Sequence, residues 1–270
     1  MNRSTPTIVV TVKNRLEHFL KTFPFNVSQV GCKYRLLYVD FDSEDDFKNV
    51  LLKTVKNNID MFSKDLIQIK LVELKTKEKY AIGRAKNLGV AYASKESDIV
   101  IVSDADTILG MDYVKKWSSL TVHSKTFVTN RIQENKAQYP KRISPEVNYG
   151  NIVVSSKDFF DVKGYDESYT GWGGDDDDLF HRLKLKGLRE INPHSLDDSS
   201  QYSIIHSDEL RFKYIASKAF NKKTLESVKE THDKVYSNKS RLTSKLSNCL
   251  SEDYYNKITQ ESILYEKHTT

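Results

Sequence analysis

Two acidic clusters carry the residue types most able to do chemistry in this sequence. Asp104 and Asp106, separated by Ala105, follow the apolar run 99–102. Side chains at positions i and i+2 of an extended segment point the same way, so both carboxylates can bind one hard divalent cation such as Mn²⁺ or Mg²⁺. Such a cation bridges a diphosphate and neutralises charge as the diphosphate departs. The structural alternative is that the pair caps a helix beginning near Met111.

The second cluster is the run Asp175 to Asp178, which follows Trp172 and two glycines. Four adjacent carboxylates repel one another, and the free N–H groups at a helix N-terminus would compensate for this repulsion. The pattern over 179–185 continues as a helix, with Gly187 suited to end it. One of these carboxylates could act as general base on an incoming hydroxyl, and Trp172 offers a flat face for a sugar ring. The alternative is a solvated, acidic start of a helix.

The segments that must position these clusters alternate between short apolar runs and amphipathic stretches. We expect strands at 7–12, 34–39, 67–71, 98–103 and 151–155, and helices at 45–61 and 83–94. This order favours an α/β fold with a mainly parallel sheet and helices on both faces, in which ligands bind beyond the carboxyl ends of the strands. Asp40 and Asp104 both follow strands in this way.

The remaining chain divides by composition. Residues 130–150 are polar and contain two prolines, which predicts a long loop. After about residue 210 the pattern is helix-like, rich in lysine and poor in glycine. We therefore predict a catalytic α/β domain over 1–210 and a basic helical extension over 211–270.

Composition and missing motifs exclude several classes of protein. The 270 residues contain no GxGxxG or P-loop glycine pattern, which leaves dinucleotide-binding and P-loop folds unsupported. The two cysteines, Cys32 and Cys249, form no CxxC motif, which fits a reducing cytoplasm. The net charge of +5 is concentrated in 207–245, so it does not favour nucleic acid as a partner. A basic helical segment of this kind is usually a solvated face; the alternative is peripheral contact with an anionic membrane or an acidic polymer.

Four segments, read together, resemble the beta-1,4-galactosyltransferase family within the GT-A glycosyltransferases. They are Lys13-Asn14-Arg15-Leu16-Glu17-His18, Gly83-Arg84-Ala85-Lys86, Ser103-Asp104-Ala105-Asp106 and the stretch from Gly150 through Arg182. The match covers roughly residues 7–210 in the family's order and spacing. Bacterial chondroitin-type polymerases and capsular family 2 transferases are similar in the tryptophan-glycine-glycine-acid segment. The resemblance implies a GT-A, Rossmann-like mixed sheet.

The resemblance also implies roles for individual residues. It implies a metal site formed by Asp106, Asp104 and His206, with Asp176 as the catalytic base. It implies donor contacts from Lys13, Arg15, Asp40, Asp42, Arg84, Asp104, Ala105 and Gly150, and acceptor contacts from Trp172, Gly173, Asp175 and Asp177. Ser203 stands where vertebrate members have a methionine metal ligand. Asn148 stands where some relatives have a bulky tyrosine, which brings UDP-GalNAc into consideration beside UDP-galactose.

These roles together imply an inverting sugar transfer in a bacterial cytoplasmic enzyme, at the inner face of the membrane. The expected donor is a UDP-sugar, the acceptor is a glycan or glycolipid hydroxyl, and the cofactor is Mn²⁺ with Mg²⁺ as the alternative. The expected setting is surface polysaccharide synthesis. Two other readings stay open: a haloacid-dehalogenase-type phosphohydrolase that uses Asp104 and Asp106, and a non-catalytic carbohydrate-binding protein with the GT-A fold.

Overall fold

The computed structural model describes residues 5–74, 81–123, 125–129, 150–167, 169, 175–191, 201–204 and 260–267. The strands are β1 (Thr7–Val12), β2 (Tyr34–Asp40), β3 (Leu66–Glu73), β4 (Ile99–Asp104), β5 (Thr107–Leu109), β6 (Thr126–Thr129), β7 (Ile152–Ser155), β8 (Arg189–Ile191), β9 (Gln201–Ser203) and β10 (Gln260–Glu266). The helices are α1 (Leu16–Val27), α2 (Phe47–Asn57), the 3₁₀ turn η1 (Ile59–Met61), α3 (Ile82–Ala93), α4 (Tyr113–His123), α5 (Ser156–Asp161) and α6 (Asp175–Leu185).

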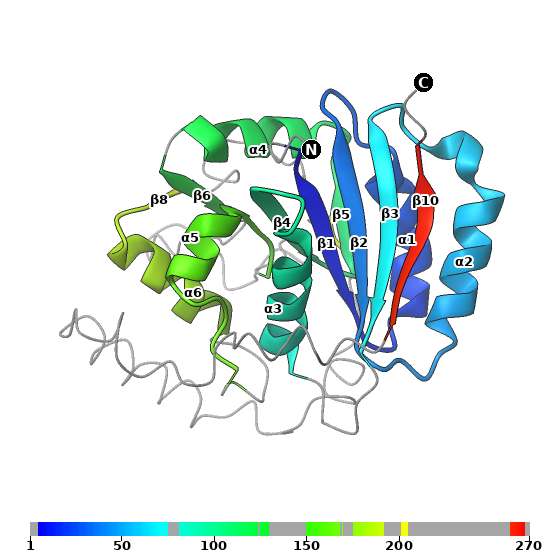
Figure 1. The fold of residues 1–270 in the computed structure, drawn as a ribbon, viewed down its shortest axis with the longest axis horizontal. Coiled ribbons are helices and arrows are strands. Elements are labelled where there is room, and N and C mark those ends of the chain that lie inside the picture. The colour runs from blue at the N-terminus through cyan, green and yellow to red at the C-terminus, as the bar shows by residue number, and fades with distance from the viewer. Residues whose placement is uncertain are drawn as a thin grey trace, which may run out of the picture.

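Eight of these strands form one mixed sheet in the order β10-β3-β2-β1-β4-β7-β6-β8 (Figure 1). The central strands β3, β2, β1 and β4 are parallel to one another, whereas β7 runs antiparallel to β4. A separate two-stranded ribbon pairs β5 with β9. The mixed and mainly parallel sheet expected from the sequence is therefore confirmed.

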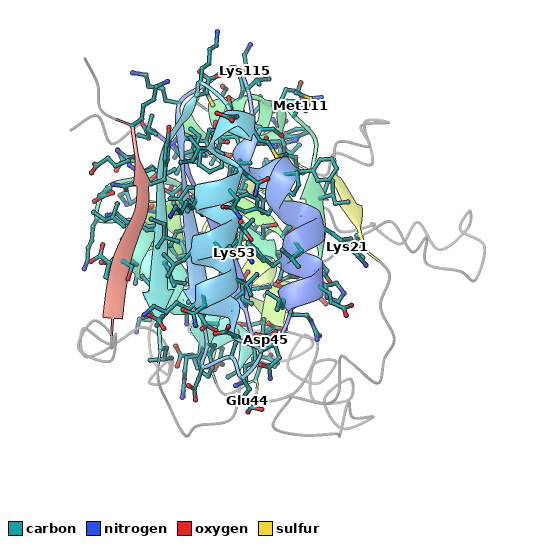
Figure 2. All side chains as sticks on the ribbon, turned by 90° about the vertical axis from the view of Figure 1, so that its right-hand side faces the viewer. Lys21, Glu44, Asp45, Lys53, Met111 and Lys115 are labelled. Carbon is teal, nitrogen blue, oxygen red and sulfur yellow. The ribbon has the colours of Figure 1, made fainter. Side chains whose placement is uncertain are left out.

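Helices cover both faces of the sheet, and the central strands are buried on both sides, as parallel strands usually are. Ile8, Val10 and Val12 of β1 point into one hydrophobic cluster, packed under α1, α2 and α4. Val9 points into the other, packed under α3, α5 and α6. Figure 2 looks onto the first face, with α1 and α2 side by side in front of the sheet.

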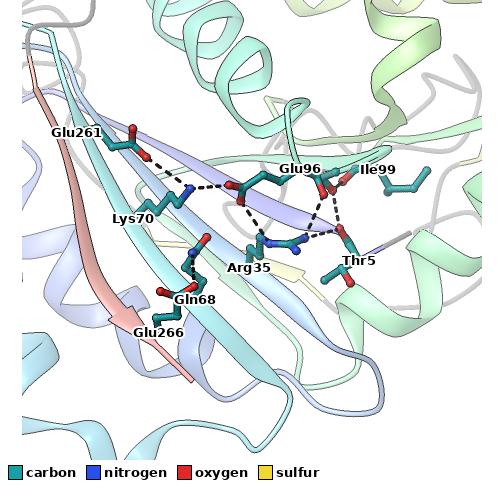
Figure 3. Close-up of polar contacts among 9 residues, drawn as sticks. Thr5, Arg35, Gln68, Lys70, Glu96, Ile99, Glu261 and Glu266 are labelled. Carbon is teal, nitrogen blue, oxygen red and sulfur yellow. Dashed lines mark hydrogen bonds and ion pairs between the residues drawn. The ribbon is translucent and has the colours of Figure 1, made fainter. Parts of the chain in front are cut away.

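The last described strand departs from the sequence prediction. Helix was expected over 211–270, but residues 260–266 form β10, which pairs antiparallel with β3 at the edge of the same sheet. Lys70 of β3 lies 3.4 Å from the Glu261 carboxylate, and Gln68 donates to Glu266 at 3.3 Å (Figure 3). Strand pairing supplies partners for the exposed backbone edge of β3, which a packed helix would leave unpaired. Residues 205–259 lie outside the described residues.

The other predicted elements agree with the structure to within a few residues. The helix expected over 45–61 is α2 followed by η1, and the helix expected over 83–94 is α3. The loop expected at 130–150 lies outside the described residues except for Gly150. None of the helices in the described ranges is long and apolar enough to span a membrane.

Candidate active site

The carboxyl ends of β1, β2 and β4 meet at the point where the strand order reverses. Val12 of β1 pairs with Asp40 of β2, and Thr11 pairs with Asp104 of β4, so aspartates flank the end of β1 on both sides. Open α/β sheets bind ligands in the crevice outside such a reversal point. Asp40 is only 2% exposed, whereas the side chain of Asp104 is 29% exposed. Of the two, Asp104 is therefore the one able to meet a ligand.

A buried lysine joins this strand end to the acidic run. Lys86 of α3 is 1% exposed, and its Nζ lies 3.3 Å from Asp104 Oδ1 and 3.1 Å from Asp176 Oδ1. It also donates to the Gly150 carbonyl at 3.0 Å, so three acceptors match the three N–H bonds of the ammonium. The two acidic clusters, far apart in the sequence, thus share one cation.

The charges of this group perturb one another strongly. Burial alone would lower the pKa of Lys86, but the charges of Asp104 and Asp176 outweigh it and raise that pKa well above its ordinary value. Burial raises the pKa of Asp176 to about 8, against the lowering effect of the Lys86 ammonium, and the charges of Asp175 and Asp104 add to the increase. A carboxylate with a raised pKa is a stronger base than an ordinary one, as proton abstraction requires.

Gly150 lies against this group because it has no side chain. A Cβ at this position would lie 2.2 Å from Asp104 Oδ2 and 2.9 Å from Lys86 Nζ. The next residue, Asn151, is buried and accepts a hydrogen bond from the backbone N–H of Asp104 at 3.0 Å. The segment entering β7 therefore fixes the end of β4 and leaves room for the lysine between the carboxylates.

Helical geometry separates the aspartates of the acidic run, which begins α6 as predicted. Asp176 faces Lys86, whereas Asp178 accepts hydrogen bonds from Arg182 Nε at 2.9 Å and Nη2 at 2.6 Å. Asp175 is 5% exposed, and its Oδ2 has no hydrogen-bond partner among the described residues. Burial raises the pKa of Asp175. The alternative of a merely solvated acidic helix start does not fit these contacts.

A second set of contacts attaches α3 to the segment before α6. Asn87 donates to the Tyr165 carbonyl at 2.8 Å and accepts from the Tyr165 N–H at 2.7 Å. Arg84, expected at the donor diphosphate, forms an ion pair with Glu167 at 3.1 Å and is partly exposed. Asn87 also donates to Glu167 at 2.9 Å. These bonds hold the chain that leads to α6 against the helix that carries Lys86.

The loops after β1 and β2 bring the other expected donor residues together. Lys13 donates to the carbonyl of Asp42, and the N–H of Ser43 donates to Asp40 Oδ1 at 3.0 Å. Asn14 takes a left-handed backbone with φ of 52°, and its N–H donates to Ser43 at 3.0 Å. Lys13, Asp42 and Arg15 are partly exposed at this edge. The carboxylate of Asp40 is buried and accepts a hydrogen bond from the backbone of the loop.

Asp106 lies in the turn between β4 and β5, beside β9. Its carbonyl accepts a hydrogen bond from the Ile204 N–H at 2.8 Å, and Thr107 pairs with Ser203. Asp106 is therefore bonded through its backbone to Ile204, the last described residue before 260. Within the described residues, no three His, Cys, Asp or Glu side chains converge on a metal position. Trp172, Gly173 and His206 lie outside the described residues.

Sequence reasoning missed the central residue of this arrangement. The sequence pattern predicts no role for Lys86, Asn87, Asn151 or Tyr165. The ring centroid of Tyr165 lies 5.2 Å from Lys86 Nζ. A usable signal was present, because Lys86 lies between core positions of a helix, next to the fully buried Ala85. A lysine in that context needs a buried anionic partner.

Part of the chain is similar to proteins of known function. A family model described as the N-terminal domain of galactosyltransferase matches residues 131–207, the part of the chain that contains α6 and its acidic run. The family match and the curated relatives show that part of this chain is similar to galactosyltransferases, and the mixed, mainly parallel sheet is that of the GT-A fold.

Human beta-1,4-galactosyltransferase 4 is 33% identical over 126 residues, which is 45% of this chain and 34% of that relative. The chain thus spans about a third of that protein's length. Staphylococcus aureus TarS 1–349, solved with UDP-GlcNAc, has a TM-score of 0.54 at 15% identity over 75% of this chain and 59% of that one. The mannosyltransferase PcManGT from Pyrobaculum calidifontis, solved with GDP-Man and Mn²⁺, has a TM-score of 0.53 at 16% identity over 70% of this chain and 54% of that one. These structures share the fold.

Proposed function

We propose that this chain is a metal-dependent, inverting glycosyltransferase that moves galactose or N-acetylgalactosamine from a UDP-sugar to an acceptor hydroxyl. The acceptor is a glycan or glycolipid, and the setting is bacterial surface polysaccharide synthesis on the cytoplasmic side of the membrane. The basic segment within 211–270 would contact that membrane peripherally.

One observation carries the proposal. Asp104 and Asp176 share the Lys86 ammonium at the strand-order reversal, at 3.3 and 3.1 Å. The reversal is where a nucleotide donor would bind, and Asp176 brings a basic carboxylate to the same crevice. A transferase needs these two functions side by side.

The chemistry follows from where these groups lie. Asp176 takes the proton from the acceptor hydroxyl as its oxygen attacks the anomeric carbon from the face opposite UDP, so one displacement inverts the configuration. Lys13, Arg15 and Arg84 would supply positive charge to the donor phosphates. Mn²⁺, or Mg²⁺ in its place, held by Asp106, Asp104 and His206, would supply charge neutralisation to the departing diphosphate. Trp172, Gly173, Asp175 and Asp177 would contact the acceptor sugar.

A screen for UDP release tests the reaction class. Purified protein is incubated with UDP-Gal, UDP-GalNAc, UDP-Glc or UDP-GlcNAc and a panel of sugar acceptors, with Mn²⁺ and then with EDTA. We expect acceptor-dependent UDP release from a galactose-type donor that EDTA abolishes. Phosphate release from an aryl phosphate, without cleavage of any UDP-sugar, would instead indicate a phosphohydrolase. Sugar binding with no UDP release would indicate a non-catalytic protein.

An Asp176→Asn variant tests the identity of the base. Loss of general-base help costs a factor of about 10² to 10⁴ in rate, so kcat should fall by that amount while UDP still binds in a calorimetric titration. Asp60→Asn is a matched control, because Asp60 is exposed on η1. Normal turnover by Asp176→Asn would show that another group takes the proton.

A further inference from the structure

Lys86 places a positive charge in the interior of the protein, at a cost in stability. The side chain is 1% exposed, so it is closed to contact with a bound substrate. Even a paired ammonium loses its hydration when it is buried, and replacing a buried ion pair by well-packed apolar side chains is often neutral or stabilising. The position is therefore one where the charge itself is needed.

The backbone of α3 holds Lys86 firmly in place. On one side, Asn87 exchanges two hydrogen bonds with the Tyr165 backbone, at 2.7 and 2.8 Å. On the other side of the helix, Gly89 packs so closely against β1 that an added Cβ would lie 2.3 Å from Val9. Because these contacts hold α3 on both sides, the Lys86 ammonium keeps one position within the crevice.

The two carboxylates depend on Lys86 to different degrees. Asp104 is the last residue of β4, and its N–H is held by Asn151, so its place is set by the sheet. Asp176 lies in the first turn of α6, and the side-chain hydrogen bond described for it is the one from Lys86. Removing the ammonium would take away this hydrogen bond and the cation shared with Asp104, so the described contacts would no longer hold the Asp176 carboxylate in place.

We propose that Lys86 is a positioning residue that holds the Asp176 carboxylate in its catalytic place relative to Asp104 and the donor. This inference rests on the proposed function, because it concerns the base of that reaction. With 1% of its side chain exposed, Lys86 acts on the reaction through the Asp176 carboxylate and not through direct contact with donor or acceptor.

A double-mutant cycle on kcat tests this. Displacing a catalytic group by about 1 Å can cost roughly 10²-fold, so Lys86→Met should lower kcat by about that factor. The KM for the donor should change less than kcat, because the sheet and Asn151 hold Asp104. In an Asp176→Asn background, Lys86→Met should lower kcat by about threefold at most, because residues that act as a unit are not additive. If the loss of kcat in the double variant equals the product of the two single losses, the two residues act independently and the inference is overturned.

Two further variants keep the test decisive. Lys53→Met, on the exposed side of α2 (Figure 2), is the control for replacing a helical lysine and should keep wild-type kcat. If Lys86→Met does not fold, Lys86→Arg keeps the charge but changes its reach. It should fold, keep its donor KM and lose about tenfold in kcat; a wild-type kcat would overturn the inference. Wild-type protein that transfers no sugar would refute the proposed function, whereas active wild type with fully active Lys86 variants would refute this inference alone.

Discussion

Replacing Gly150 with alanine perturbs the site by a displacement that the structure defines. The new Cβ would lie 2.2 Å from Asp104 Oδ2, and ordinary contact begins at 3.4 Å, so the carboxylate must move by about 1 Å. Lys86, 2.9 Å from the same Cβ, must move with it. A misplacement of about 1 Å in a catalytic site costs about 10²-fold in rate, which is about 2.7 kcal/mol of activation free energy.

The assay is the initial rate of UDP release at saturating donor and acceptor, together with thermal unfolding of each variant. Gly187→Ala is the matched control, because Gly187 has φ of +93° and nothing lies within 4 Å of an added Cβ. That variant should lose about 1 kcal/mol or more of stability through backbone strain and keep its kcat. A Gly150→Ala protein with wild-type kcat would refute the claim that close packing at this glycine sets the position of Asp104.

Three other substitutions test the packing of α3, the buried ion pair of α6 and an exposed ion pair on α5. Gly89→Ala should cost about 1–3 kcal/mol in the free energy of unfolding through overpacking against the sheet, as measured by urea denaturation. Arg182→Leu removes the guanidinium that lies 2.6 Å from the Asp178 carboxylate. Because that carboxylate is largely buried, leaving it unpaired should lower the free energy of unfolding by about 3 kcal/mol in the same assay. Hydrogen bonds from Lys157 and Lys186 lower the pKa of Asp161, so these contacts stabilise the fold fully above the ordinary pKa of the carboxyl and lose their effect as the pH falls through the lowered one. Asp161→Asn should therefore be less stable than wild type at pH 7, with a difference that shrinks as the pH falls through the lowered pKa; a constant difference would contradict this.

The parts of the fold that local pattern controls were predictable from sequence. An apolar run followed by Asp104 reads as a buried strand with a carboxylate at its ligand-binding end, and β4 has that form. The aspartates before Leu179 and the left-handed Gly187 mark the two ends of α6, because both features act on the backbone within one turn. Expectations for residues outside the described ranges, His206 among them, remain predictions.

The parts that depend on distant pairing were not predictable. Lys86 meets Asp104, Gly150 and Asp176 only after three separate segments have folded together, and a lysine in a helix is ordinarily exposed. The strand β10 was read as helix because its partner lies far away, with Gln68 and Glu266 separated by 198 positions. Local periodicity carries no information about such a partner.

The position of β10 has a consequence for the order of folding. During synthesis, the backbone edge of β3 emerges nearly two hundred residues before the strand that covers it, and over that interval it can pair with any extended chain nearby. Closing so long a loop is slow, because the entropy of the intervening chain must be lost before the contact is gained. The nascent chain is therefore vulnerable to aggregation at the edge of the sheet formed by β3, before β10 is made.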